Sequence, residues 1–283
     1  MQLKNVPRNS LLFTKRVFYR DSVSYPFLSG DAFSKCADLN LSSSKSFNAD
    51  SREISTAKVI FCPSHKLGEF LANYGNSVTA KVMILGNSDH DFNEPIVGLP
   101  SSIKKVFCQN LMFEDSRYQV IPIGIENLRL AKNGIVDLFK PIYFNMAKQE
   151  KILVGPFGLT HPERYELLNA NYGNSLIENH FKRMSPKEYA RLSSSFRYVA
   201  VPRGNGMDTH RFWETLYRGG IPVVKKSSWS KQIAALGYPI IELESWDQGV
   251  ILNELDKKQV NDFSRDLPIL WWPWWEELIR KTI

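Results

Sequence analysis

The sequence predicts an α/β protein with two halves of similar size, each built on a mostly parallel sheet. Short, continuous apolar runs recur along the 283 residues, and each ends in polar or glycine-containing sequence, as buried parallel strands do. Segments with helical periodicity separate several of these runs, which is the order found in βαβ units. The length allows one large α/β domain or two domains of ordinary size, and two α/β halves of similar size are the simplest account.

Composition favours a soluble globular protein in a reducing compartment. Hydrophobic residues make up 43% and charged residues 23% of the chain, and no apolar run is long enough to span a bilayer. The apolar stretches of the first twenty residues are only two or three residues long, so we expect no signal peptide. Cys36, Cys62 and Cys108 are widely spaced without a CxxC pair, so we expect neither a zinc site nor a set of disulfide bonds.

The net charge of +7 favours an anionic partner. A phosphorylated small molecule, a polyanionic glycan, a membrane face and nucleic acid all meet that description, and a solvated basic surface without a partner is an equal alternative. No aromatic and basic motif of a nucleic-acid-binding fold is present, so we expect no nucleic-acid partner. Nothing in the sequence indicates an oligomeric state.

In the first half, residues 38–56 are rich in Ser, Asn and Asp and predict an irregular loop. A strand is expected over 57–64, followed by a short helix that ends at Gly75. A second buried strand is expected over 82–85. Two more strands with polar ends complete this half, over residues 104–111 and 118–127.

A change of composition around residues 145–150 divides an N-terminal domain, 1–147, from a C-terminal domain, 148–283. Ser185 and Pro186 predict a helix start in the second half, as N-cap and first-turn residue. The expected elements of this half are strands at 152–155, 197–202, 221–224 and 239–243, and helices at 162–170, 185–195, 230–236 and 248–256. A closing helix follows in the tryptophan-rich segment WWPWWEELIRKTI.

The segment RGNGMDTHRFWETLYRGGIPVV, residues 203–224, lies between two predicted strands and is therefore the crossover of a βαβ unit. Ligands bind at the carboxyl ends of such strands. Gly204 and Gly206 flank Asn205 where the chain must turn sharply and where a ligand can approach the backbone. The following helix, capped by Asp208 or Thr209, directs free N–H groups and its positive dipole end at the same place, which suits a phosphate.

Polar side chains of the same helix complete a candidate nucleotide site. Arg203 and Arg211 suit the charge and oxygen geometry of a diphosphate, and Glu214 can accept hydrogen bonds from ribose hydroxyls. Ordinary ion pairs of Glu214 with Arg211 and Arg218 are the alternative explanation. His210 and Glu214 have the spacing of half a metal site, but no second histidine is near in sequence, so we expect no metal there.

These residues resemble the signature of the exostosin-like glycosyltransferases and their bacterial relatives, in which an Arg-Gly-x-Gly turn precedes an Arg-x-Trp-Glu helix and a Gly-Ile-Pro-Val strand. The segments VFCQNL, PIGIEN and GNSD resemble N-terminal parts of the bacterial relatives more weakly. The resemblance implies the GT-B architecture, two Rossmann-like domains facing across a cleft, with the nucleotide sugar held mainly by the C-terminal one. It implies donor binding by Arg203, Gly204, Asn205, Gly206, Asp208, Thr209, His210, Arg211 and Glu214.

The implied activity is transfer of a sugar from a nucleotide-diphosphate donor to a hydroxyl of a glycan or lipid-linked glycan, in synthesis of a surface polysaccharide or glycoconjugate. The donor is a cosubstrate, and no cofactor is expected. The chain lacks the long N-terminal extension, membrane anchor and cysteines of the animal exostosins. That difference favours a cytoplasmic bacterial or viral enzyme. A peripheral contact of the basic, tryptophan-rich chain with the inner membrane face stays open, although packing of the last helix against the N-domain is the preferred role of those tryptophans.

Asp89 is the expected catalytic base, because it follows a predicted strand of the other half and can face the cleft. Inversion by direct displacement is the expected mechanism. Asp89, His90 and Asp91 also form a D-x-D sequence, so a metal-dependent glycosyltransferase is one alternative, and a non-catalytic nucleotide- or glycan-binding protein on the same scaffold is another. Further cleft candidates at predicted strand ends are His65, Glu126, Asn127, Gly155 and His161, with Arg164 as an assisting residue; turn and cap roles explain them equally well.

Overall fold

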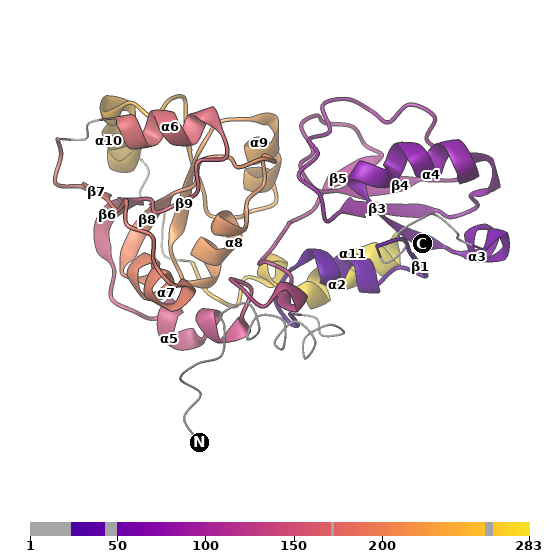
Figure 1. The fold of residues 1–283 in the computed structure, drawn as a ribbon, viewed down its shortest axis with the longest axis horizontal. Helices are drawn as coiled ribbons and strands as arrows, with labels where there is room; N and C mark the ends of the chain where they lie inside the picture. Colours follow the sequence, from indigo (N-terminus) through magenta and orange to yellow (C-terminus); the bar gives the residue numbers. More distant parts are fainter. Residues whose placement is uncertain (1–23, 43–49, 171–172, 258–262) are drawn as a thin grey trace, which may run out of the picture.

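The computed structural model describes residues 24–42, 50–170, 173–257 and 263–283. They form two five-stranded sheets in which every strand pair is parallel, which confirms the predicted α/β class (Figure 1). The first sheet has the order β1-β2-β3-β4-β5, and the second has the order β10-β9-β8-β6-β7. Their strands are β1 (Leu39–Asn40), β2 (Val59–Pro63), β3 (Val82–Gly86), β4 (Lys105–Cys108), β5 (Tyr118–Val120), β6 (Gln149–Val154), β7 (Ile177–Asn179), β8 (Phe196–Ala200), β9 (Ile221–Lys225) and β10 (Ile241–Leu243).

Helices cover both sheets, and short 3-10 turns connect several of them (Figure 1). The first half contributes α2 (Gly30–Lys35), α3 (Ser51–Thr56) and α4 (Leu67–Tyr74), and α5 (Pro141–Phe144) leads to the second sheet. The second half contributes α6 (Pro162–Asn169), α7 (Pro186–Ser194), α8 (His210–Tyr217), α9 (Ser228–Ala235), α10 (Gln248–Lys257) and α11 (Trp272–Lys281). The 3-10 helices are η1 (Ser64–Lys66), η2 (Gly75–Ser77), η3 (Leu128–Leu130), η4 (Val136–Phe139) and η5 (Pro268–Leu270).

The predicted irregular loop over residues 38–56 is wrong for its described parts. Its beginning is β1, which pairs with β2, and its end is α3, whose N-cap Asp50 accepts the backbone N–H of Arg52 at 2.9 Å. Residues 43–49 lie outside the described part of the chain. The polar composition had suggested a loop, but tertiary pairing at a sheet edge and a single cap were enough to order these short elements.

The predicted strand over residues 118–127 is also too long, since β5 ends at Val120. The chain then leaves the sheet and meets residues 27–29, where Ile125 donates its N–H to the carbonyl of Leu28 at 2.8 Å. Gly124 makes this approach possible: its φ is 69°, and a Cβ there would lie 2.0 Å from the Leu28 oxygen. The segment after β5 therefore packs against residues 27–29 of the same half.

The second sheet has the order of a flavodoxin-like doubly wound fold, in which β7 lies on one side of β6 and the later strands follow on the other. The direction of winding reverses between β6 and β8. This is the position where such sheets bind ligands. The expected start of α7 is confirmed, because Ser185 and Glu188 form a reciprocal capping box before Pro186.

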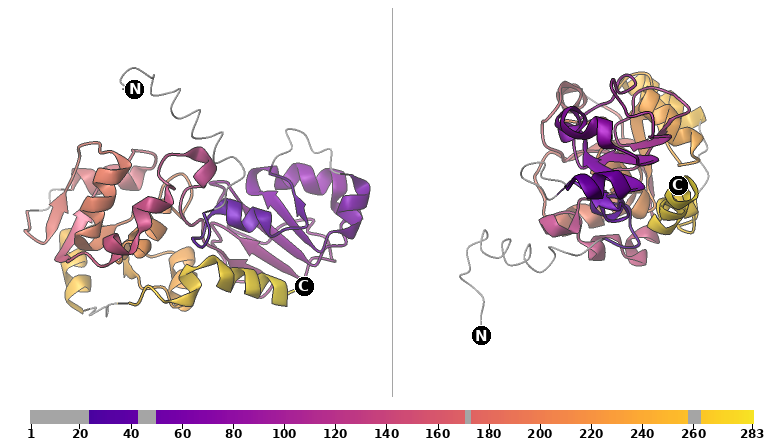
Figure 2. Two further views of the ribbon diagram at one scale, coloured as in Figure 1. Left: turned by 90° about the horizontal axis from the view of Figure 1, so that it is seen from below. Right: turned by 90° about the vertical axis from the view of Figure 1, so that its right-hand side faces the viewer.

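The last helix, α11, which we expected to cross back to the N-terminal half, packs beneath α2 (Figure 2). The rings of Trp272 and Trp275 lie 5.1 and 6.0 Å from the ring of Phe33, and all three side chains are buried. One continuous hydrophobic core accordingly includes residues of both halves. Within the described residues, no helix combines the length and apolar character needed to cross a membrane.

Candidate ligand-binding site

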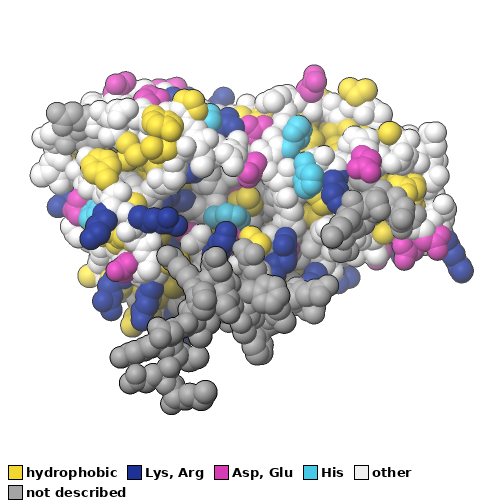
Figure 3. Space-filling model, in the orientation of Figure 1, with side chains coloured by type: hydrophobic (Ala, Val, Ile, Leu, Met, Phe, Trp, Pro, Cys, Tyr) yellow, Lys and Arg dark blue, Asp and Glu magenta, His cyan; other side chains and the backbone are white. Residues whose placement is uncertain are grey.

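A cavity of about 650 Å³ lies where the carboxyl ends of the two sheets face each other. The segments after β6 and β8, at the switch point of the second sheet, form most of its wall, and the segments after β3 and β5 contribute Asp89 and Ile123. Figure 3 shows basic and histidine side chains over the middle of this face, where the halves meet. The expected placement of a site at strand ends therefore agrees with the geometry.

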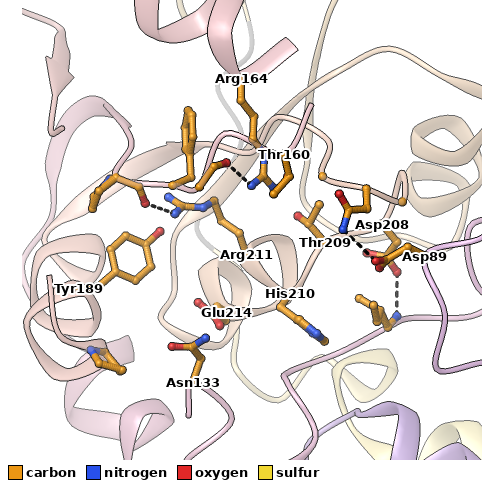
Figure 4. Close-up of a pocket in the computed structure, with 18 of the residues that line it drawn as sticks. Asp89, Asn133, Thr160, Arg164, Tyr189, Asp208, Thr209, His210, Arg211 and Glu214 are labelled. Carbon is orange, nitrogen blue, oxygen red and sulfur yellow. Dashed lines mark hydrogen bonds between the residues drawn. The ribbon is translucent and has the colours of Figure 1, made fainter. Parts of the chain in front are cut away.

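Arg211 extends from the first turn of α8 into this cavity (Figure 4). Its guanidinium donates to the carbonyl oxygens of Gly155 and Pro156 and lies 4.6 Å from the ring centroid of Tyr189. Stacking on Tyr189 and the two carbonyl bonds hold the side chain in one orientation. No described carboxylate forms an ion pair with it.

Arg164 of α6 enters the same cavity from the opposite wall (Figure 4). It donates to the carbonyl oxygens of Gly158 and Arg203, each at 2.8 Å, and has no ion pair with any carboxylate in the described parts of the chain. Burial and the nearby charge of Arg211 lower the pKa of Arg164 to about 10. Two cations in a partly desolvated cavity, both without an anionic partner, favour binding of an anion.

The amino end of α8 adds unsatisfied donors to the same wall. Thr209 is the N-cap, but its side chain makes no capping bond, and its buried Oγ1 has no described hydrogen-bond partner. The hydroxyl of Tyr189, which also lines the cavity, is buried without a partner as well. A bound ligand with hydrogen-bonding groups would satisfy atoms that are otherwise costly to bury.

His210 lines the cavity and contacts the first half of the chain. Its Nδ1 lies 2.8 Å from the carbonyl oxygen of Gly124. A carbonyl oxygen only accepts, so Nδ1 carries the proton and Nε2 of the neutral ring is an acceptor. The tautomer is therefore set by a contact between the halves.

Glu214, the expected ribose ligand, lies buried on the cavity wall. Its Oε2 pairs with Nη1 of Arg218 at 3.2 Å, and the Arg218 side chain is only 2% exposed. The ordinary i,i+4 ion pair considered as an alternative is thus present, and it occupies one carboxylate oxygen. No bond of Oε1 is seen among the described residues.

Arg203, expected to contact a donor diphosphate, does not line this cavity. Its guanidinium forms an ion pair of 2.6 Å with Asp91. The next motif residue that reaches the other half is Asn205, whose Nδ2 donates to Asp89 Oδ2 at 3.1 Å. Asp89 is exposed and borders the cavity from the first half, as expected for a residue facing the cleft.

Asp208 is a buried link between the halves rather than a helix cap. Its Oδ2 accepts the backbone N–H of Ile123 at 2.7 Å, and its Oδ1 accepts Nε1–H of Trp213 at 2.8 Å. Burial raises the pKa of this carboxyl from 3.8 to about 7, against the lowering effect of these hydrogen bonds. The backbone N–H of Asp208 in turn donates to Asn110 at 2.7 Å.

Gly206 must be small because the first half of the chain approaches it closely. A Cβ at this position would lie 2.9 Å from Oδ1 of Asn110 and 3.1 Å from the backbone oxygen of Asp89. Gly204 lines the cavity beside Arg164. The glycines of the motif therefore serve both the cavity and the contact between the sheets.

The five further cleft candidates lie outside the cavity lining. His65 is exposed, His161 is the N-cap of α6 and accepts the N–H of Glu163, and Gly155 precedes the lining segment. Glu126 accepts the N–H of Asn133, and buried Asn127 accepts the N–H of Asp31. Three of them, His161, Glu126 and Asn127, have cap, turn or packing contacts that explain their residue types.

Several lining residues were not identified in the sequence: Asn133, Phe181, Arg183, Met184 and Tyr189. They come from a loop of the first half and from the segment around the start of α7. An arginine, a tyrosine and an asparagine in such segments are ordinary surface residues by composition, so no local signal marks them. Only the packing of α7 beside α8 brings Tyr189 against Arg211.

The D-x-D sequence is engaged in protein contacts. Asp91 pairs with Arg203 and accepts the N–H of Met207 at 3.0 Å, while Asp89 accepts from Asn205. In the part of the chain that the structure describes, no three metal-ligating side chains form a group. A metal at Asp91 would have to displace the Arg203 guanidinium.

No protein-family model matches the chain, and no curated protein matches it significantly.

Proposed function

We propose that this protein is a glycosyltransferase of the GT-B type, which moves a sugar from a nucleotide-diphosphate donor to a hydroxyl of a glycan or lipid-linked glycan. The observation that carries the proposal is the cavity at the switch point of the second sheet, where Arg164 and Arg211 converge without a described carboxylate partner. Doubly wound sheets bind nucleotides at this position. The resemblance of residues 203–224 to the exostosin-like signature supports the same donor class.

The donor diphosphate is assigned to Arg164, Arg211 and the amino end of α8. The charge that develops on the leaving diphosphate is stabilised there by two guanidinium groups and by helix N–H groups that are already oriented. Arg164 takes the place that the sequence had suggested for Arg203, because Arg203 lies outside the cavity and is neutralised by Asp91. Glu214 keeps one carboxylate oxygen for the ribose hydroxyls.

The acceptor is assigned to the side of the cavity formed by the first half. Its hydroxyl oxygen attacks the anomeric carbon, the bond from that carbon to the diphosphate breaks, and the hydroxyl proton passes to a base. Asp89 is the proposed base, since it is exposed and borders the cavity. His210 is the alternative, because its Nε2 is an acceptor in the neutral ring.

The proposed location is cytoplasmic. Cys36, Cys62 and Cys108 are all free thiols, and burial raises the pKa of Cys36 and Cys62 to about 12. Thiols in this state suit a reducing compartment, and they are poor nucleophiles at neutral pH. The proposed chemistry therefore does not use a cysteine.

A panel of nucleotide sugars tests the proposal. A matching donor raises the melting temperature because it binds the native state alone, and slow release of nucleoside diphosphate with or without acceptor demonstrates turnover. Binding without turnover across a wide panel of acceptors would support the non-catalytic alternative. Loss of turnover in EDTA with rescue by Mn²⁺ would support the metal-dependent alternative; persistence of turnover in EDTA is expected.

A further inference from the structure

A second, smaller cavity of about 170 Å³ lies at the carboxyl ends of β8 and β9. Val201 and Val224 line it at these strand ends, and Ser227 lines it at the start of α9. It is separate from the cavity of about 650 Å³ to which we assign the donor, called the donor cavity below, because the two cavities share no lining residue. Arg203 and Met207 also line the second cavity, whereas the turn between them, residues 204–206, lines the first one. This turn therefore lies between the two cavities.

Two residues that line the second cavity each have a buried hydrogen-bond donor without a described acceptor. Trp229 lines it and is 2% exposed, and its Nε1–H has no partner among the described residues. Nε of Arg203 is likewise buried and without a partner. Leaving such donors unpaired in a buried place is costly, which indicates that an acceptor group binds there.

The amino end of α9 adds donors of the same kind. Ser227 caps the helix, and Ser227 and Ser230 form a reciprocal capping box. A capping box satisfies the N-cap and third-position N–H groups and leaves those of the first two helical positions, Ser228 and Trp229, for a ligand or solvent. The positive end of the helix dipole reinforces the preference for an anion.

Charged side chains at the cavity also favour an anion. Arg203, Lys225 and Lys226 line it against a single carboxylate, Glu163, which already accepts N–H groups from Arg203 and from the Trp246 indole. Each of these cations also has a carboxylate neighbour outside the cavity: Arg203 lies 2.6 Å from Asp91, Lys225 lies 3.8 Å from Glu166, and Lys226 lies 2.6 Å from Glu244. The two lysine pairs are partly exposed, so they hold the lysines only weakly.

We propose that this cavity binds a tetrahedral oxyanion, a phosphate or a sulfate, either as a free ion or as an ester group on a sugar. Such a group presents acceptor oxygens in several directions, and its negative charge suits the three basic side chains that line the cavity. The volume exceeds that of one oxyanion and leaves room for part of an attached sugar. The inference does not depend on the proposed transferase activity.

Calorimetric titration with inorganic phosphate at constant ionic strength tests this site. We expect saturable binding to the full-length protein, at least about tenfold weaker affinity in Lys225→Gln/Lys226→Gln, and unchanged affinity in the matched control Lys231→Gln on the exposed side of α9. Trp229→Phe keeps an aromatic ring and removes the N–H, and should weaken phosphate severalfold. Unchanged phosphate affinity in the double lysine variant would overturn the proposal, and binding of an adventitious ion only, without saturation, would do so too.

Arg164→Gln/Arg211→Gln separates this site from the donor cavity. Phosphate binding that survives in this variant supports a second site, whereas its loss would assign the ion to the donor cavity and overturn the inference. Titration with glucose 6-phosphate and with inorganic sulfate distinguishes a sugar ester from a free ion. A protein that binds phosphate here but no nucleotide sugar would contradict the proposed function and leave the oxyanion site standing.

Discussion

Arg203 and Asp91 form an ion pair of 2.6 Å that joins the two halves of the chain. Both side chains are about one-fifth exposed, so solvent screens the pair only in part. The neighbouring residues Asn205, Asp208 and His210 also contact the first half, through Asp89, Ile123 and Gly124. The segment expected to bind a nucleotide thus also connects the second half to the first half beside the cavity.

Breaking this ion pair should destabilise the contact between the halves. Arg203→Gln and Asp91→Asn should each lower the free energy of unfolding by about 1–3 kcal/mol, the usual worth of a charged hydrogen bond. A double-mutant cycle with urea unfolding measures their coupling. Lys281→Gln, in the exposed pair with Glu277, is the control and should have little effect. Additive effects of the two substitutions would contradict a direct energetic link.

Removing Arg164 or Arg211, the arginines to which we assign the donor diphosphate, should weaken nucleotide binding. Arg164→Gln and Arg211→Gln should each lower the affinity for nucleoside diphosphate by about 10- to 100-fold, because a charged hydrogen bond to phosphate is lost. Calorimetry measures the affinity, and Arg191→Gln on the exposed face of α7 is the control. Affinities equal to that of the control would place the diphosphate elsewhere.

Glu214 should affect stability as well as ribose binding. Glu214→Gln leaves the buried Arg218 guanidinium without its carboxylate, which should cost about 3–5 kcal/mol of unfolding free energy. The double variant Glu214→Gln/Arg218→Met should recover much of that loss, since no unpaired charge is left buried. If Glu214 holds the ribose, both variants should bind nucleotide less tightly, by about 1–3 kcal/mol. Normal nucleotide affinity in the double variant would remove the ribose role.

Asp89→Asn should abolish most transfer while donor affinity stays unchanged, because general-base catalysis contributes about 10²–10⁴ in rate. Single-turnover rates and donor affinity are the two measurements. His210→Gln serves as the comparison, since it also lines the cavity and its ring has a free acceptor nitrogen. Near-normal transfer by the Asp89 variant, with a large loss for the His210 variant, would assign the proton transfer to His210.

Asp208 should make stability fall as pH rises from about 4 to about 7. Its pKa is raised from 3.8 to about 7 in the folded protein, so between these values the native state keeps a proton that the unfolded chain has released. The native state is favoured below this window, and the advantage is lost as pH rises through about 7. The difference in unfolding free energy between wild type and Asp208→Asn, measured from pH 4 to 8, isolates this contribution. The NMR shift of the Trp213 indole N–H should titrate with the same midpoint, and a flat profile would contradict the buried carboxyl's raised pKa.

Local patterns in the sequence predicted the buried strands and the helix starts. Val82–Gly86 is a continuous apolar run, and Ser185 and Glu188 satisfy backbone N–H groups in the first turn of α7. Neighbours along the chain therefore decide these elements. The predictions failed where distant chain segments decide the structure. β1 forms because β2 is beside it, and the chain leaves β5 because Gly124 admits the backbone of Leu28.

The sequence by itself determined the α/β class, the crossover at residues 203–224 and the concentration of glycines and charged residues within it, because periodicity and turn chemistry act over a few neighbours. Tertiary structure decided which of those residues reach the cavity. Arg203 pairs with Asp91, which lies 112 positions away in the chain. Arg211 instead stacks on Tyr189 and lines the cavity together with Arg164. An ion pair depends on distance in space and on burial, and both follow from how the two sheets meet.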